Sequence, residues 1–244
     1  MPIVAADLIK YGSASRPEDD VSTSGGAIDA DDRPVFTQMT ANAVIAVVSD
    51  GADTRTVTVY GRLASGARDS EALVLNGAVE VIGAKTFERL LRVVAASASG
   101  TRTVTVKQGS GGSTLGTIPI NEIGFYALFI DSASESGATV RYEKVFWRNA
   151  HATLTLNSAK VTLTADPSAK IKIALATAKN DSVSVANRKT SPGLSFSDDG
   201  VELTVPGGTL EAASAIGTWV EMSLAGDDPP VRSTFTTRLA GTSV

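Results

Sequence analysis

The sequence predicts an all-β protein that consists of two β-sandwich domains, immunoglobulin-like or jelly-roll-like, and an extended N-terminal arm. Short apolar segments follow one another roughly every 8 to 12 residues with turn residues between them, a spacing typical of sandwiches. Val and Thr are abundant and aromatic residues make up only 5% of the chain, a mixture that favours pleated sheets. No segment sustains the 3.6-residue apolar period of an amphipathic helix.

The first predicted element is the arm. Residues 12–34 are rich in Gly, Ser, Asp and Pro and contain few large apolar side chains. Such a segment buries too little surface to fold alone. Two interpretations stay open: a disordered N-terminal tail, or an extended arm that becomes ordered only against a neighbouring subunit.

A first group of strands follows the arm. Residues 54–62 alternate between apolar and polar side chains, as a half-buried strand does. Asn76-Gly77 predicts a hairpin with a type I′ turn. Residues 85–94 are ambiguous between a helical turn and a strand. The strands predicted in this group are 44–48, 54–62, 71–75, 78–82, 91–95, 101–107 and 115–120.

A second group of strands fills the C-terminal part of the chain. The polar segment 131–137 precedes this part and is a candidate domain boundary. Asn157-Ser158 predicts a tight turn between two alternating strands. The strands predicted in this group are 140–147, 152–156, 160–164, 170–175, 194–196, 201–205, 219–224 and 234–239. The aromatic-rich segment 123–130 is also predicted to be extended and precedes the boundary.

Composition excludes several functional classes. The 244 residues suffice for one large or two medium domains. The net charge of -4 comes from intermixed charges without a basic stripe, so we expect no nucleic-acid partner. The chain has no Cys, which excludes disulfides, thiol nucleophiles and Cys-based metal sites. No apolar run reaches the roughly 18 residues of a membrane span, and the N-terminus lacks the pattern of a signal peptide.

Candidate chemical groups are few. His151 is the only histidine and is expected in a polar surface turn, not in a triad or metal site. The carboxylates at 18–20 and 29–32 lack the spacing of a calcium loop. Trp147 and Trp219 lie in alternating strands and are expected in the core, with a partner interface as the alternative. We therefore predict no enzyme, no catalytic residue, no cofactor and no metal.

Two parts of the chain resemble virion structural proteins of tailed bacteriophages. Residues 140–149, VRYEKVFWRN, followed by 152–161, ATLTLNSAKV, resemble a strand and hairpin of that family. Residues 56–61 and 70–77 resemble a second module that is common in virion proteins. Glu143 stands where a basic residue is commoner in the family, a departure that we expect to affect surface contacts.

The resemblance implies a nested domain organisation. In relatives that lack the second module, the N-terminal segment runs more directly into the strand at 140–149. The resemblance thus implies that residues 1–40 belong structurally with a C-terminal sandwich at 138–244, and that 41–130 form an inserted sandwich.

The resemblance also implies a function. The leading expectation is a capsid decoration or cement protein that is made in the host cytoplasm and resides in the virion. Its partners would be the major capsid protein or other virion proteins and further copies of itself, with a trimer favoured. The alternatives are a tail, neck or baseplate component, or a carbohydrate-binding sandwich that uses Trp147 or Trp219. The residues expected to make assembly contacts lie in the arm: Arg16, Asp19, Asp20, Ile28 and Arg33.

Overall fold

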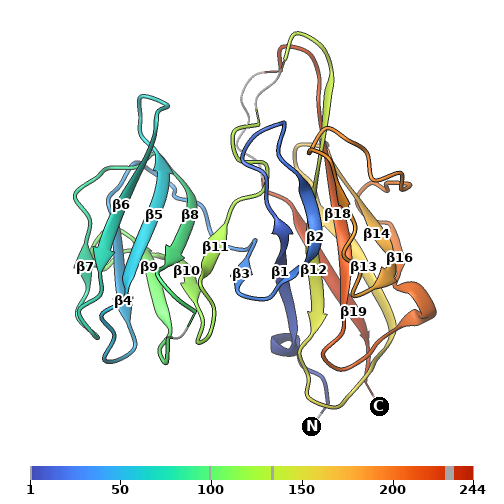
Figure 1. Cartoon of the computed structure of the whole chain (residues 1–244), viewed down its shortest axis with the longest axis horizontal. Helices are drawn as coiled ribbons and strands as arrows, with labels where there is room; N and C mark the ends of the chain where they lie inside the picture. The colour runs from blue at the N-terminus through green and yellow to red at the C-terminus, as the bar shows by residue number, and fades with distance from the viewer. Residues whose placement is uncertain (1, 99, 133–134, 229–233, 244) are drawn as a thin grey trace. The chain divides into compact units, whose positions relative to one another are not determined.

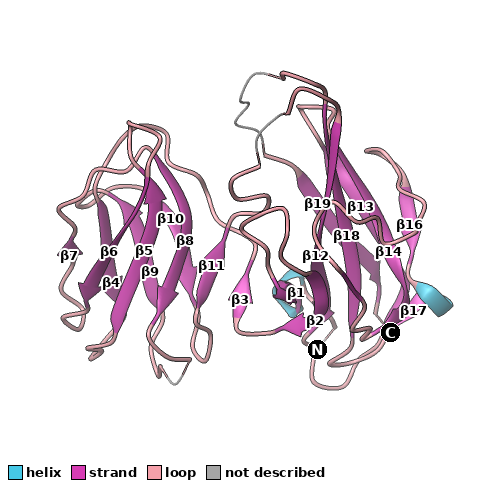
Figure 2. Ribbon diagram, turned by 45° about the horizontal axis from the view of Figure 1, so that its top comes forward, coloured by secondary structure: helices cyan, strands magenta, loops and turns pink. Residues whose placement is uncertain are grey.

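The computed structural model describes residues 2–98, 100–132, 135–228 and 234–243 and confirms the all-β class (Figure 1). The chain divides into two compact units. Unit 1 comprises Met1–Asp29 and Phe129–Val244, and unit 2 comprises Ala30–Leu128. Strands and connecting loops dominate both units (Figure 2). The helical segments among the described residues are two short 3₁₀ turns, Ala5–Asp7 and Pro206–Gly208.

Unit 1 contains a six-stranded sheet with the order β14-β18-β12-β1-β2-β15. The strands of this sheet are β1 (Leu8–Ser15), β2 (Ser24–Asp29), β12 (Thr139–Asn149), β14 (Ile171–Lys179), β15 (Ser184–Val185) and β18 (Ala215–Leu224). Its pairings between β1 and β2, β1 and β12, β12 and β18, and β14 and β18 are all antiparallel.

The second sheet of unit 1 is built around β13. It consists of β13 (Leu156–Ala165), β16 (Glu202–Thr204), β17 (Thr209–Leu210) and β19 (Thr236–Thr242). Leu163 of this sheet is fully buried, as are Phe146, Ile173 and Trp219 of the larger sheet. The two chain ends also meet in unit 1, where the Ile3 amide donates to the Ser243 hydroxyl at 3.2 Å.

Unit 2 has two sheets and its own core. One sheet has the order β10-β9-β4-β7 and the other β3-β11-β8-β5-β6. Buried side chains such as Val47, Val57, Phe87, Val106 and Phe125 form one cluster. The strands are β3 (Asp32–Arg33), β4 (Ile45–Ser49), β5 (Thr56–Arg62), β6 (Arg68–Val74), β7 (Val81–Ile82), β8 (Arg89–Ala95), β9 (Val104–Gln108), β10 (Thr114–Ile118) and β11 (Gly124–Tyr126).

The N-terminal segment is not an extended arm. β1 pairs with β12 and with β2, so that the segment predicted as an arm supplies interior strands of the larger sheet (Figure 1). Ser24 and Gly25 of β2 are both buried, and their small size suits the space at this position. A Cβ on Gly25 would come within 2.6 Å of the Trp219 ring. The polar composition thus reflects tight packing beneath a tryptophan, where larger side chains have no room.

Unit 2 begins earlier than the sequence predicts. Residues 30–40 were expected with the C-terminal sandwich, yet they belong to unit 2, which starts at Ala30. Met39 is buried in the unit 2 core, and the Phe36 ring stacks on Phe125 at 5.3 Å. Unit 2 ends at Leu128, ahead of the polar segment 131–137, in which residues 133 and 134 lie outside the described residues.

Entry and exit of unit 2 lie side by side. β3, just after the entry, pairs with β11, just before the exit, and the pairing is parallel: Gly124 faces Asp32 and Phe125 faces Arg33. Both connections to unit 1 therefore leave unit 2 next to each other, the geometry expected of a domain inserted into another.

Two predicted turns are corrected. Asn157-Ser158 lie within β13, where Ser158 has a φ of 50° and the register with β19 shifts, so these residues form a bulge in a strand. Asn76-Gly77 do turn the chain, but β6 and β7 lie in different sheets. The predicted hairpin between them is therefore wrong. The segment 85–94, for which the sequence allowed a helical turn or a strand, contributes its residues from Arg89 onward to strand β8.

Candidate functional site

The loop between β1 and β2 carries most of the residues predicted for assembly. Arg16 begins this loop, and its guanidinium pairs with Asp29 at the end of β2 at 2.6 Å. Ile28 is half-buried in β2, where it pairs with Ser13 of β1. These two residues therefore help to close the β1–β2 hairpin.

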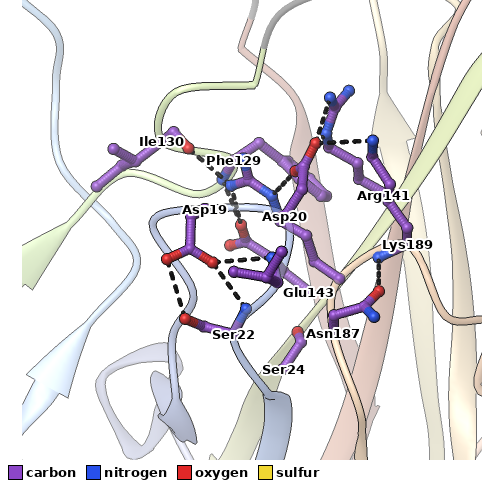
Figure 3. Close-up of polar contacts among 12 residues, drawn as sticks. Asp19, Asp20, Ser22, Ser24, Phe129, Ile130, Arg141, Glu143, Asn187 and Lys189 are labelled. Carbon is purple, nitrogen blue, oxygen red and sulfur yellow. Dashed lines mark hydrogen bonds and ion pairs between the residues drawn. The ribbon is translucent and has the colours of Figure 1, made fainter.

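Asp19 forms a tight turn at the tip of the loop. Its carboxylate accepts hydrogen bonds from the Val21 amide at 2.9 Å and from the Ser22 amide at 2.7 Å (Figure 3). The Val21 amide, followed by the Ser22 amide and hydroxyl, lowers the pKa of Asp19. The turn presents the Val21 side chain to solvent with 80% of its surface exposed.

Asp20 points the other way, into a network of charges in which Arg141, Glu143 and Arg188 are buried. The network comprises Asp20, Glu135, Arg141, Glu143, Arg188 and Lys189 and is here called the Asp20 network. Figure 3 labels its members Asp20, Arg141, Glu143 and Lys189. Arg141 of β12 donates to both carboxylate oxygens of Asp20, at 2.9 and 2.8 Å. Arg188 donates to the same carboxylate at 2.5 Å. The Arg141 contact, followed by those of Arg188 and Lys189, holds the pKa of Asp20 far below its usual range.

Glu143 is the buried carboxylate of this network. Burial raises the pKa of Glu143 to about 7. Its carboxylate accepts a hydrogen bond from the Phe129 amide at 3.0 Å and lies 3.7 Å from the Arg188 guanidinium. Only 3% of the residue is exposed, so the expectation of a surface role for Glu143 is wrong.

The network fixes two segments of unit 1 to β12. Asp20 ties the β1–β2 loop to Arg141. Arg188 also donates to the Ile130 carbonyl at 2.7 Å, which fastens the segment where the chain re-enters unit 1. Arg141 and Arg188 are 2% and 1% exposed. Through these contacts, Asp20 anchors the β1–β2 loop to two buried arginines.

A second buried ion pair joins β12 to the segment before β15. The Lys144 ammonium contacts Asp181 at 2.6 Å and donates to the carbonyls of Gly26 and Val183, each at 3.1 Å. Burial lowers the pKa of Lys144, against the opposing effect of Asp181. All three donors of the ammonium thus have an acceptor, and the pair stabilises the edge of the larger sheet.

Arg33 lies in unit 2, apart from the other predicted residues. Its guanidinium makes a bidentate contact with Glu122, at 2.6 and 2.5 Å. The five predicted residues are therefore divided: four lie on the β1–β2 hairpin and one on β3.

Unit 2 carries a cluster of arginines that the sequence analysis did not single out. Arg62 of β5 stands directly opposite Arg68 of β6 and Arg89 of β8. Tyr60 stands opposite Arg92 on the same face of the sheet. We call this surface the arginine face: Tyr60, Arg62, Arg68, Arg89 and Arg92. Its members are up to 32 residues apart in sequence, and only the strand register brings them together.

The remaining candidates have structural positions. The His151 Nδ1 accepts from the amides of Thr153 and Leu154, at 3.2 and 3.0 Å, which places it in a turn. Trp219 is 1% exposed and belongs to the core, as predicted. Trp147 is half-buried and Lys10 lies 4.8 Å from its ring centroid. A sugar platform on Trp219 is excluded by this burial.

The described residues show no group of three side chains arranged to hold a metal. No helix in the part of the chain that the structure describes is long and apolar enough to cross a membrane. Comparisons with protein-family models, curated proteins and solved structures found no match to this chain.

Proposed function

We propose that the chain is a non-enzymatic structural protein of a tailed-phage virion. Its role is that of a capsid decoration or cement protein, which stabilises the head through contacts with the major capsid protein and with further copies of itself. Two features support this role: a rigid, exposed contact element and a framework that resembles that family.

The geometry of the β1–β2 loop is the main support for this function. It exposes Val21 at its tip, while Asp19 and Asp20 hold the turn from both sides. An ordered apolar tip loses little conformational entropy when it enters a partner, which favours protein–protein binding.

The family resemblance includes the framework of unit 1. Residues 140–149 correspond to β12, which lies between β18 and β1 in the larger sheet. Arg141, Glu143 and Lys144 of this strand are buried and each has a polar partner. The charged residues of the strand therefore stabilise the unit, as a structural protein requires.

Quantitative mass spectrometry of purified particles tests this function. Particles would be prepared from an induced culture of the strain that encodes the chain. A decoration protein is expected at a fixed ratio to the major capsid protein, with many copies per particle. A few copies per particle would instead indicate a tail, neck or baseplate component, and absence of the chain would contradict a virion role.

A pair of surface variants tests the role of the loop. Val21→Lys places a charge on the exposed tip and is expected to reduce incorporation into particles at least about tenfold. Val201→Lys makes the same change at another valine of unit 1, 45% exposed, and is expected to incorporate normally. Equal incorporation of the two variants would show that the β1–β2 loop is not part of the contact surface.

A further inference from the structure

We propose that Lys10 is a nucleophilic amine, to which activated acyl groups of the acyl phosphate class attach in preference to the other lysines of the chain. The inference goes beyond the proposed virion role and does not depend on it. It rests on the place of Lys10 in unit 1, on the absence of a counter-ion beside it, and on the contrast with the other lysines. The product is an amide on the Lys10 side chain.

Lys10 lies beside apolar side chains in the larger sheet. It belongs to β1, an interior strand, and stands directly opposite Trp147 of β12. Side chains that oppose each other in this way lie on the same side of a sheet, and the Lys10 ammonium is 4.8 Å from the centroid of the Trp147 ring. Ile216 of β18, the next residue in the row, is fully buried. The half-buried Lys10 is thus partly shielded from water.

Lys10 differs from the other lysines because it has no carboxylate beside it. Among the described residues, the Lys10 ammonium contacts the Trp147 ring and makes no hydrogen bond or ion pair. Each of the other lysines lies within 3.3 Å of an Asp or Glu oxygen: Lys85, Lys107, Lys144, Lys160, Lys170, Lys172, Lys179 and Lys189. A neighbouring carboxylate favours the protonated amine, which is not a nucleophile.

Burial without a counter-ion favours the neutral, nucleophilic form of the Lys10 amine. It lowers the pKa of Lys10 to about 8. Roughly a tenth of the Lys10 amines are then neutral at pH 7, against roughly one in 2,500 for a lysine of ordinary pKa. The lower basicity makes the amine a weaker nucleophile, as it does for thiols, and offsets part of this gain. We therefore expect a net rate advantage of about tenfold.

The reaction is an acyl transfer to nitrogen. The lone pair of the neutral Lys10 amine attacks the carbonyl carbon of the acyl phosphate, and a bond forms between Nζ and this carbon. The bond between the carbon and the bridging oxygen breaks, and inorganic phosphate leaves with its electron pair. The amine proton passes to the solvent. The amide is uncharged at neutral pH, so the reaction also removes the desolvated cation beside Trp147.

Acetylation of the folded full-length protein with acetyl phosphate tests the proposal. Mass spectrometry of chymotryptic peptides gives the initial rate at each lysine. Lys10 is expected to react at least about fivefold faster than Lys172, whose side chain is 41% exposed and lies 3.3 Å from Asp198. The Lys10 rate is also expected to level off above about pH 8, while the Lys172 rate keeps rising towards the ordinary pKa of a lysine, about 10.4.

Two variants and a denatured sample serve as controls. Asp198→Asn removes the carboxylate beside Lys172 but leaves that lysine exposed, so Lys172 is expected to stay slow. Lys10→Arg keeps a cation beside Trp147 and is expected to remove the fast site while far-UV circular dichroism stays native. In concentrated urea, Lys10 and Lys172 are expected to react at equal rates. A Lys10 rate no higher than that of Lys172 in the folded protein, a Lys172 in Asp198→Asn as fast as Lys10, or a preference for Lys10 that persists in urea would overturn the proposal.

Discussion

Asp20 is the residue on which two buried arginines of unit 1, Arg141 and Arg188, converge. Asp20→Ala leaves Arg141 and Arg188 buried with fewer counter-charges, and removing one partner of such a network is expected to cost roughly 2–4 kcal/mol. Urea unfolding followed by tryptophan emission measures this loss in unit 1, since both tryptophans, Trp147 and Trp219, lie there.

The neighbouring Asp19 supplies the matched control. Its carboxylate is exposed and its hydrogen bonds with Val21 and Ser22 lie within its own turn, so Asp19→Ala is expected to lower stability much less than Asp20→Ala. Equal losses for the two variants would mean that Asp20 is not anchored to the two arginines.

Glu143 makes the stability of unit 1 depend on pH. Its pKa of about 7 lies above the usual value of 4.5, so the folded state binds more protons than the unfolded state between these values. The stability of unit 1 therefore falls as the pH rises through this window and levels off above it. The loss amounts to roughly 2–3 kcal/mol between pH 5 and 8.

Glu143→Gln isolates this effect. The amide oxygen can still accept the hydrogen bond from the Phe129 amide, but the side chain no longer titrates. Urea unfolding at pH 5, 6.5 and 8 is expected to show that the variant lacks the decline seen in the unmodified chain. The same decline in both proteins would assign the titration to another group.

At the scale of elements, the β1–β2 hairpin is an integral part of unit 1. Deletion of residues 1–29 removes two strands from the larger sheet and exposes the edge of β12. We expect unit 1 to unfold, with a red shift of tryptophan emission, while unit 2 keeps its strand signal in circular dichroism. Native tryptophan emission after the deletion would restore the interpretation of this segment as a separable arm.

The sequence predicts elements well where a strand is marked by its own alternation. Residues 54–62 and 140–147 become β5 and β12 with nearly the predicted bounds. β2 has no such pattern, because its small residues are selected by contacts with a distant partner. The Asp20 network is hidden for the same reason: Arg141 and Asp20 are 121 residues apart in sequence, and no local pattern links them.

At the scale of the whole molecule, unit 2 has the properties of an independent domain. It has its own core cluster, and its entry and exit strands pair with each other. The fragment 30–128 is expected to fold alone and to unfold cooperatively with heat, as monitored by far-UV circular dichroism. A gradual, non-cooperative loss of signal would mean that unit 2 depends on unit 1.

The assembly role is a property of the particle, so the particle provides its most direct test. A cryo-EM reconstruction of virions purified from the encoding strain is predicted to contain density for two β-sandwich units per copy, repeated regularly over the outer face of the head. A fully interpreted particle, head and tail, without density for this chain would contradict the account.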